Sequence, residues 1–242
     1  METGKTGKYF KYAIGEIVLV VIGILIALSI NTWNETNKSN KEAHFQLSKL
    51  KDNLTSDKEQ LNAAILSDSI YINHLIFCVK VLSSEQNATY QEFIDGLQHL
   101  STTMSFDPIR GTFDGLISSG KIELIRNQKL LEDLFSYYNP NTYKAWDNAL
   151  KSYSRNVITP YLLNFDHVSN ISDANFGENF TQFDISKFTV PTKTIDDYKN
   201  NLFIINGVRR KIQMFEGQTF AYKQLLIVID SLIQSVDFEL TK

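Results

Sequence analysis

The strongest constraint on this chain is an apolar run near the N terminus, from Tyr12 to Ile30. Its 19 residues would form a helix roughly 28 Å long, close to the thickness of the hydrocarbon core of a bilayer. The Ile, Leu and Val residues of the run contribute roughly −4 to −7 kcal/mol to insertion. Its one carboxylate, Glu16, would cost about +2.5 to +3.5 kcal/mol at mid-bilayer and less near the end of a span. The run is therefore expected to cross a membrane.

A cleaved signal peptide and a buried helix of a soluble protein are the alternatives to a retained anchor. Lys5, Lys8 and Lys11 form a basic N-terminal region, and Ala27-Leu28-Ser29 resembles a cleavage site. Against cleavage, the apolar run is long for a signal peptide. Trp33 also follows it at the position where an interfacial anchor belongs. We therefore favour a retained signal-anchor helix.

The charges that flank the run give the expected topology. Lysines precede it, whereas Lys38 and Lys41 follow it closely, so the bias in positive charge is weak. A short basic tail before a first span still favours an N terminus in the cytoplasm. The expected division is a cytoplasmic tail over residues 1–11, a transmembrane helix over 12–33 and an extracytoplasmic domain over 34–242.

Two stretches of the sequence resemble a known family. The first is the signature YAIGEI-LVVIGILIAL-IN-WNE, which begins at Tyr12 and ends at Glu35. The second runs from Phe113 to Asn127 and precedes a Leu-rich helix. Both resemble an uncharacterised family of bacterial single-span membrane proteins, classed as a domain of unknown function. The resemblance implies a bacterial inner-membrane protein with a periplasmic helical domain, and it implies no activity.

Hydrophobic periodicity predicts an all-α fold after the span. One amphipathic helix is expected over residues 41–82, and a second, continuous helix over residues 196–236. Because the two are equal in length and lie at opposite ends of the domain, we expect an antiparallel pair in an elongated bundle. The helices between them are expected to pack as a cap at the far end. Residues 166–194 are expected to form a long loop, with a strand pair as an option at 180–188.

Each long helix is expected to present one apolar stripe. In the first helix, Asp57 and Asp68 interrupt it. Its apolar members are Leu47, Leu50, Leu54, Leu61, Ile65, Ile72, Ile76 and Val79. The stripe of the second helix has the heptad spacing of a coiled coil. Its members are Val208, Ile212, Phe215, Thr219, Tyr222, Leu226, Ile229, Ile233 and Val236.

Shorter helices are expected between the long ones. Their expected ranges are 90–100, 113–118, 127–138 and 142–158. Gly120 is a natural stop for the second of these helices, and Asn127 is the N-cap of the third. Pro160 is expected to kink or end the fourth.

We expect no catalytic, cofactor-binding or metal-binding residues. Gly115-x4-Gly120-Lys121 matches most of a phosphate-binding loop, but Ile122 replaces the Ser or Thr that would hold magnesium. The four histidines show no metal-binding spacing, and Cys78 lies on an apolar stripe as a small buried hydrophobe. A net charge of −3 gives no basic excess for nucleic acid.

Six residues of the span are expected to lie at the membrane interface or in helix packing. They are Gly15, Glu16, Gly23, Ala27, Asn31 and Trp33. Gly23 and Ala27 form a small-xxx-small face, which favours close helix association. For Glu16 two interpretations stay open. Its carboxylate either reaches the headgroups or pairs with a group inside an oligomer.

The expected function is a non-enzymatic binding or scaffold module that a single span holds at the membrane. Its partner would be another protein or further copies of the chain, through the span or the bundle. One alternative is a subunit of a membrane complex that uses Glu16 for ion coupling or sensing. The other is an enzyme whose site is assembled through space.

Overall fold

The structure is a computed structural model, and it describes residues 6–165 and 193–241. The regular elements in these ranges are all helices, which confirms the all-α prediction. The α-helices are α1 (Thr6–Leu82), α2 (Tyr90–Leu97), α3 (Gly111–Ser118), α4 (Gln128–Tyr137), α5 (Pro140–Tyr153), α6 (Thr159–Phe165), α7 (Ile195–Lys199) and α8 (Leu202–Leu240). Short 3-10 turns are η1 (Gln98–Leu100) and η2 (Ile122–Leu124), and η3 (Ser154–Ile158) is a π-helical turn. Of the long loop expected over residues 166–194, residues 166–192, with the optional strands, lie outside the described residues.

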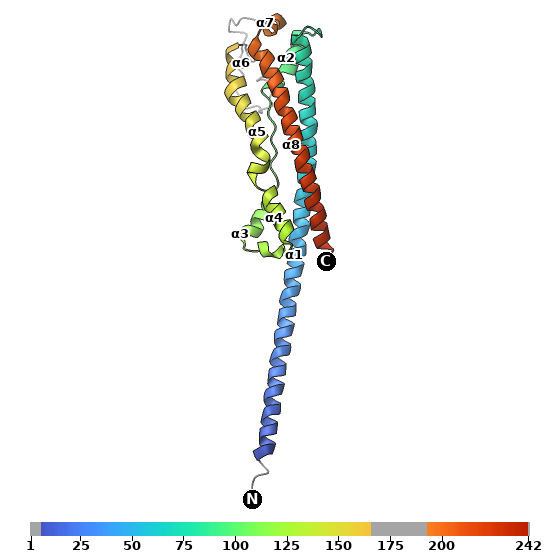
Figure 1. The fold of residues 1–242 in the computed structure, drawn as a ribbon, viewed down its shortest axis with the longest axis vertical. Coiled ribbons are helices and arrows are strands. Elements are labelled where there is room, and N and C mark those ends of the chain that lie inside the picture. The colour runs from blue at the N-terminus through green and yellow to red at the C-terminus, as the bar shows by residue number, and fades with distance from the viewer. Residues whose placement is uncertain (1–5, 166–192, 242) are drawn as a thin grey trace, which may run out of the picture.

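Helix α1 is one unbroken element that joins the apolar run to the bundle (Figure 1). Its 77 residues correspond to a rod roughly 115 Å long. It ends as predicted at Leu82, where Ser84 adopts a left-handed φ of 63°. There the N–H groups of Glu85 and Gln86 both bond to the carbonyl of Lys80. The sequence treated the span and the first bundle helix separately, and the structure makes them continuous.

Helices α1 and α8 lie side by side and antiparallel, as predicted (Figure 1). Two ion pairs hold this register, Lys51–Asp237 and Lys58–Asp230, each with a nitrogen–oxygen distance of 2.6 Å. Farther along, Thr219 donates a hydrogen bond of 3.2 Å to Asp68. The C terminus therefore lies at the end of the bundle from which the free part of α1 emerges.

The apolar stripes were predicted only in part. In α8 the buried positions alternate in steps of four and three, but they include Lys211 and Gln218 where the prediction had Ile212 and Thr219. In α1 the predicted interruptions Asp57 and Asp68 are themselves fully buried, and Ile76 is exposed. A hydrophobicity pattern excludes polar residues, which explains the missed positions of Lys211 and Gln218. The expected Leu226 and Ile233 are also displaced by one position from the buried Leu225 and Leu232. The buried row of α8 is Ile204, Val208, Lys211, Phe215, Gln218, Tyr222, Leu225, Ile229, Leu232 and Val236.

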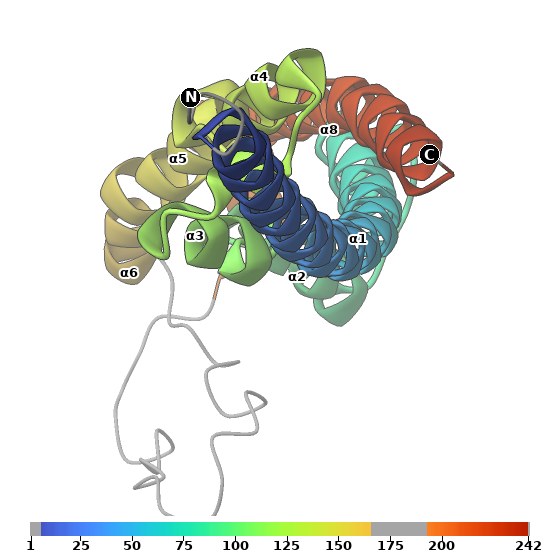
Figure 2. The same ribbon diagram turned by 90° about the horizontal axis from the view of Figure 1, so that it is seen from below.

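The intervening helices do not form a cap at the far end, as the sequence had suggested. Helices α2, α6 and α7 lie there, whereas α3 and α4 flank the near end and α5 runs along α8 (Figures 1 and 2). Polar contacts hold the near end: Lys121 bonds Glu42 at 2.5 Å, and Arg126 bonds Asn40 at 2.7 Å. The physical reason is that the chain returns to the base between α2 and α3.

Two helix boundaries also differ from the prediction. The expected helix from Asp196 is broken at Asn200 and Asn201, because the Asn201 side chain accepts the N–H of Ile204 at 3.1 Å and starts α8. Pro160 was expected to kink or end its helix, and it does not end it. The π turn η3 precedes it, and the Thr159 N–H bonds the carbonyl of Ser154. The wider turn accommodates a proline that has no N–H and crowds the carbonyl four residues earlier.

The core consists of two hydrophobic clusters, one at each end of the bundle. The near cluster includes Leu54 of α1 and Tyr222 of α8, and the far cluster includes Leu75 and Phe215 of the same helices. The buried polar residues Asp68, Asp147 and Gln218 lie between the two clusters along α1, α5 and α8. We call these three residues the polar layer.

Gly120 and Gly115 give a matched test of the turn after α3. Gly120 has a φ of 71°, and in both glycines an added Cβ would meet no atom within 4 Å. Gly120→Ala should lower the free energy of unfolding by about 1 kcal/mol, because a side chain disfavours a left-handed backbone. Gly115→Ala should instead raise it by up to about 1 kcal/mol, because Ala favours a helix interior. Chemical denaturation of both variants measures the difference, and equal effects would contradict the turn geometry.

Candidate functional site

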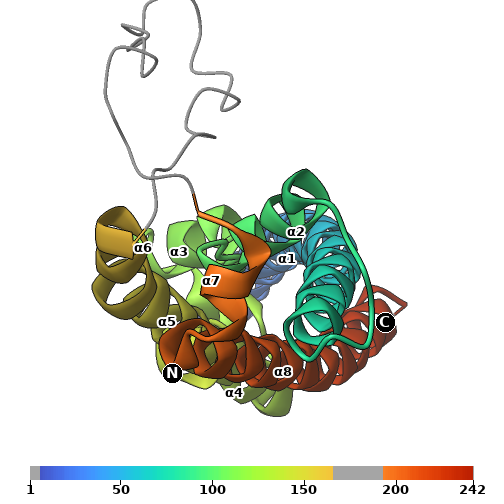
Figure 3. The ribbon, with the colours of Figure 1, turned by 90° about the horizontal axis from the view of Figure 1, so that it is seen from above.

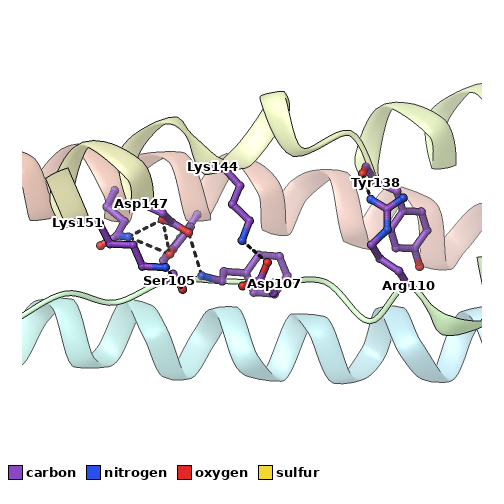
Figure 4. A network of polar contacts seen from close by, with 10 residues as sticks. Ser105, Asp107, Arg110, Tyr138, Lys144, Asp147 and Lys151 are labelled. Carbon is purple, nitrogen blue, oxygen red and sulfur yellow. Dashed lines mark hydrogen bonds and ion pairs between the residues drawn. The ribbon is translucent and has the colours of Figure 1, made fainter. Parts of the chain in front are cut away.

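The most unusual feature of the bundle is an extended segment that passes between its helices. Residues 102–110, here called the strap, have no helical structure and run between α1 and the pair α5 and α8 (Figure 4). Phe106 and Pro108 are buried in it. Backbone N–H and carbonyl groups inside a protein need hydrogen-bond partners, and an extended segment cannot supply its own.

Asp147 of α5 provides the central partner of the strap. One carboxylate oxygen accepts the N–H of Phe106 at 3.0 Å, and the other accepts the amide of Gln218 at 2.6 Å and the hydroxyl of Tyr222 at 2.7 Å. The Gln218 amide also donates to the carbonyl of Met104 at 3.1 Å. Three donors thus satisfy a fully buried carboxylate, and the network ties α5, α8 and the strap together.

Asp57 of α1 plays the same role at the near end of the strap. Its carboxyl oxygens accept the N–H of Ile109 at 2.9 Å and the hydroxyl of Tyr137 at 2.8 Å. Burial raises the pKa of Asp57, and the two hydrogen bonds oppose that rise. The carboxyl group therefore joins α1 to the strap and to α4.

Charged side chains hold the exposed edge of the strap (Figure 4). Lys144 pairs with Asp107, and Arg110 donates to the backbone carbonyl of Tyr138. Arg110 also pairs with Asp114 at 3.1 Å. These groups are partly exposed, so they position the strap rather than contribute much stability.

Asp68 and Lys211 are buried ionisable residues whose hydrogen bonds go to Thr219 and Ser154 rather than to the strap. Asp68 accepts one hydrogen bond, from Thr219, and its other oxygen is buried without a partner. Burial is the main cause that raises its pKa to about 7. Lys211 donates to Ser154 at 2.5 Å, and burial lowers its pKa to about 8. Two under-bonded groups on facing helices are the kind of feature that marks a functional site.

These buried groups are closed to solvent in the folded bundle. The polar layer and Lys211 are fully buried, so no substrate reaches them without opening of the bundle. In residues 6–165 and 193–241 no three His, Cys, Asp or Glu side chains are placed to hold a metal ion. Gly115 lies in helix α3, and Lys121 pairs with Glu42, so the phosphate-loop match is a helix stop.

Two residues that looked isolated in the sequence are brought together by the fold. The rings of His74 and His99 lie 4.8 Å apart, and His99 also stacks on Tyr71. Burial, and then the nearby His74, lower the pKa of His99.

Cys78 is buried as predicted, and burial raises the pKa of its thiol to about 12. Low reactivity follows, because the thiolate is the reactive form.

The six predicted span residues all lie on the free part of α1. Each is exposed there, and added Cβ atoms on Gly15 and Gly23 would meet nothing within 4 Å. Asn31 donates to Glu35 at 3.1 Å, which is a local bond along the helix. The role of these residues at a membrane interface stays a prediction. By length and composition, α1 is suited to crossing a membrane.

The comparisons with known proteins give a family and no activity. The profile of a family of unknown function (DUF6090) matches residues 16–157. That range includes most of the free part of α1, the strap, and both strap-binding aspartates, Asp57 and Asp147. No curated protein and no solved structure matches the chain.

Replacing the two kinds of buried aspartate should have opposite consequences. Asp147→Asn should lower the free energy of unfolding by about 2–4 kcal/mol, because an amide offers one acceptor to three buried donors. Asp68→Asn should change it by less than about 1 kcal/mol near pH 4, because it keeps the single bond from Thr219. Urea unfolding measures both. A larger loss for Asp68→Asn would show that Asp68, not Asp147, supports the bundle.

The raised pKa of Asp68 predicts a pH dependence of stability. Because the folded pKa of about 7 exceeds the ordinary value of 3.8, this group contributes stability below pH 4 that is lost as the pH rises towards 7. Asp68→Asn should remove that loss, so the variant should gain on the wild type across this window. Thermal unfolding at several pH values tests it, with the exposed Asp52→Asn as control. A constant difference between wild type and Asp68→Asn would refute the assignment.

Proposed function

The chain belongs to the family of unknown function DUF6090, and from that premise we propose that it is a single-pass membrane protein which acts as a non-enzymatic scaffold. In this proposal the apolar part of α1 crosses a bacterial inner membrane. The bundle then stands on the periplasmic side and presents its surface to a protein partner.

The observation that carries the proposal is the free part of α1. Its apolar residues from Ile14 to Ile30 project from the bundle, and none of the apolar window is buried against the described protein (Figure 1). An exposed apolar surface of this size is costly in water and typical of contact with lipid or protein. A helix that crosses a bilayer pairs its own backbone groups, which fits an isolated span.

The ends of the apolar part support an anchor with the bundle close above it. Trp33 is well exposed at the boundary, where aromatic rings favour the membrane interface. The first contacts of α1 with the bundle, at Asn40 and Glu42, follow within about three turns. The orientation rests on the lysines that precede the span.

The scaffold role is supported by how the buried polar groups are used. Asp57 and Asp147 bind the backbone of the strap through hydrogen bonds within the fold. Their use is structural, and the exposed faces of α1, α2 and α8 remain for a partner.

Membrane fractionation tests the anchor directly. The full chain should sediment with membranes and stay there in alkaline carbonate, because about 19 apolar residues contribute several kcal/mol to insertion. A variant that lacks residues 1–33 should be released into the soluble fraction with its helical content retained. Full-length protein in the soluble fraction, or a mature chain that begins near Ile30, would contradict the anchor.

A reporter fused after Lys242 tests the orientation separately. Alkaline phosphatase at this end should be active, and a reporter that fluoresces only in the cytoplasm should be dark. The opposite pair of results would place the bundle in the cytoplasm and leave the anchor itself unaffected.

A further inference from the structure

A groove opens between α1 and α2 in the far half of the bundle. Its volume is about 630 Å³, and its walls are Ile70, Asn73, His74 and Phe77 of α1 with Glu92 and Asp95 of α2. This volume lies within the range of roughly 300–1,000 Å³ that is typical of binding sites. Figure 3 shows α2 lying against α1 at this end of the molecule.

The groove exists because α2 touches α1 through a glycine. A Cβ on Gly96 would lie 2.8 Å from the Cys78 sulfur and 3.3 Å from the carbonyl of His74. The two helices therefore approach closely along one line, and their outer side chains diverge on either side of it. The capping box of Thr89 and Glu92 fixes the first turn of α2 and so fixes this wall.

The floor of the groove is apolar, and it extends along α1. Ile70 is 46% exposed, and Leu66, one turn earlier on the same face, is 64% exposed. Phe77, two turns after Ile70, is partly exposed. Leu66 and Ile70 lie outside the buried row that faces α8, whereas Phe77 is partly buried against the far cluster and closes one end of the floor.

The rim of the groove is acidic. Glu92 and Asp95 are exposed, and within the described residues neither takes part in an ion pair. Asp95 accepts a neutral hydrogen bond of 2.7 Å from Gln91, and Glu92 accepts the N–H and the hydroxyl of Thr89, both at 2.8 Å. An apolar floor beside carboxylates that pair with no cation in the described residues is complementary to a segment that carries apolar residues on one face and Lys or Arg beside them.

We propose that this groove binds an amphipathic, basic helix of a partner protein. The partner's apolar residues contact Leu66, Ile70 and Phe77, and its cations lie beside Asp95 and Glu92. The inference rests on the proposed scaffold role and names the chemistry of the partner. A second copy of this chain and an acidic segment are the competing occupants.

A binding experiment on the full chain tests the proposal. The protein is placed in phosphatidylcholine nanodiscs, with empty discs as the blank. The probe is a fluorescent helical peptide of Leu and Lys in an amphipathic pattern, and its control has Glu in place of Lys. The Leu/Lys peptide should bind at least roughly tenfold more tightly than the Leu/Glu peptide. Equal binding of the two peptides would overturn the basic partner.

Matched variants locate the binding. Ile70→Lys and Asp95→Lys should each weaken Leu/Lys binding by roughly tenfold or more. Ile227→Lys on the exposed face of α8 and Asp52→Lys near the base of the bundle should leave it unchanged. Leu66→Lys replaces Ile70→Lys if the latter loses its helical circular dichroism. Equal losses in test and control variants would overturn the groove.

Photo-cross-linking in membranes separates the remaining occupants. A photoreactive phenylalanine at Ile70 should give an adduct whose partner peptide is amphipathic and rich in Lys or Arg, and Asp95→Lys should abolish it. An adduct with a second copy of the chain would overturn the proposal in favour of self-association. Because every measurement uses protein already in a membrane, failure of the groove leaves the anchor standing.

Discussion

The structure depends on the pairing of the backbone of the strap inside a helical bundle. A helix satisfies its own peptide groups, but an extended segment brings unpaired N–H and carbonyl groups into the interior. Asp57, Asp147 and Gln218 supply the missing partners from three different helices. Each unpaired group would cost about 1–3 kcal/mol. The positions of α1, α5 and α8 are therefore set by the strap as much as by apolar contact.

The polar layer also divides the core. Apolar packing alone would let α1 and α8 slide by one heptad at modest cost, because Leu, Ile and Val substitute for one another. The bond of Asp68 with Thr219 matches α1 and α8 at one register only, and the bond of Gln218 with Asp147 does the same for α8 and α5. We interpret the layer as a device that fixes this register, a role best attested for buried polar residues in helical assemblies.

The sequence predicts the elements of the fold better than their arrangement. Helix ends with local signals were found correctly, including the Asn127 cap of α4 and the Gly120 stop after α3. The antiparallel pairing of α1 and α8 followed from their lengths. The break at Asn200 was missed because Asn is compatible with a helix. The capping of α8 by the Asn201 side chain depends on three-dimensional context.

The candidate site was beyond prediction for a physical reason. A hydrophobicity pattern assigns polar residues to the surface, so Asp57, Asp68, Lys211 and Gln218 were excluded from the buried rows that they occupy. Their partners lie on distant parts of the chain, as with Asp147 and the N–H of Phe106. A polar residue that falls on an otherwise regular heptad row was the available signal. Reading such residues as buried would have placed Asp57, Asp68, Lys211 and Gln218 in their rows, but not the apolar positions that are displaced by one, such as Leu225 and Leu232.

Because α1 is one continuous helix, it fixes the distance between the proposed span and the far end of the bundle. If the helix crosses the bilayer at Trp33 as proposed, Phe77 stands roughly 65 Å above the headgroups, since each residue adds 1.5 Å. No glycine or proline interrupts α1 between these two positions. The distance from Trp33 to Phe77 is therefore not changed by a kink at glycine or proline. Whatever the bundle holds is therefore kept at one fixed height, within reach of molecules well clear of the lipid surface.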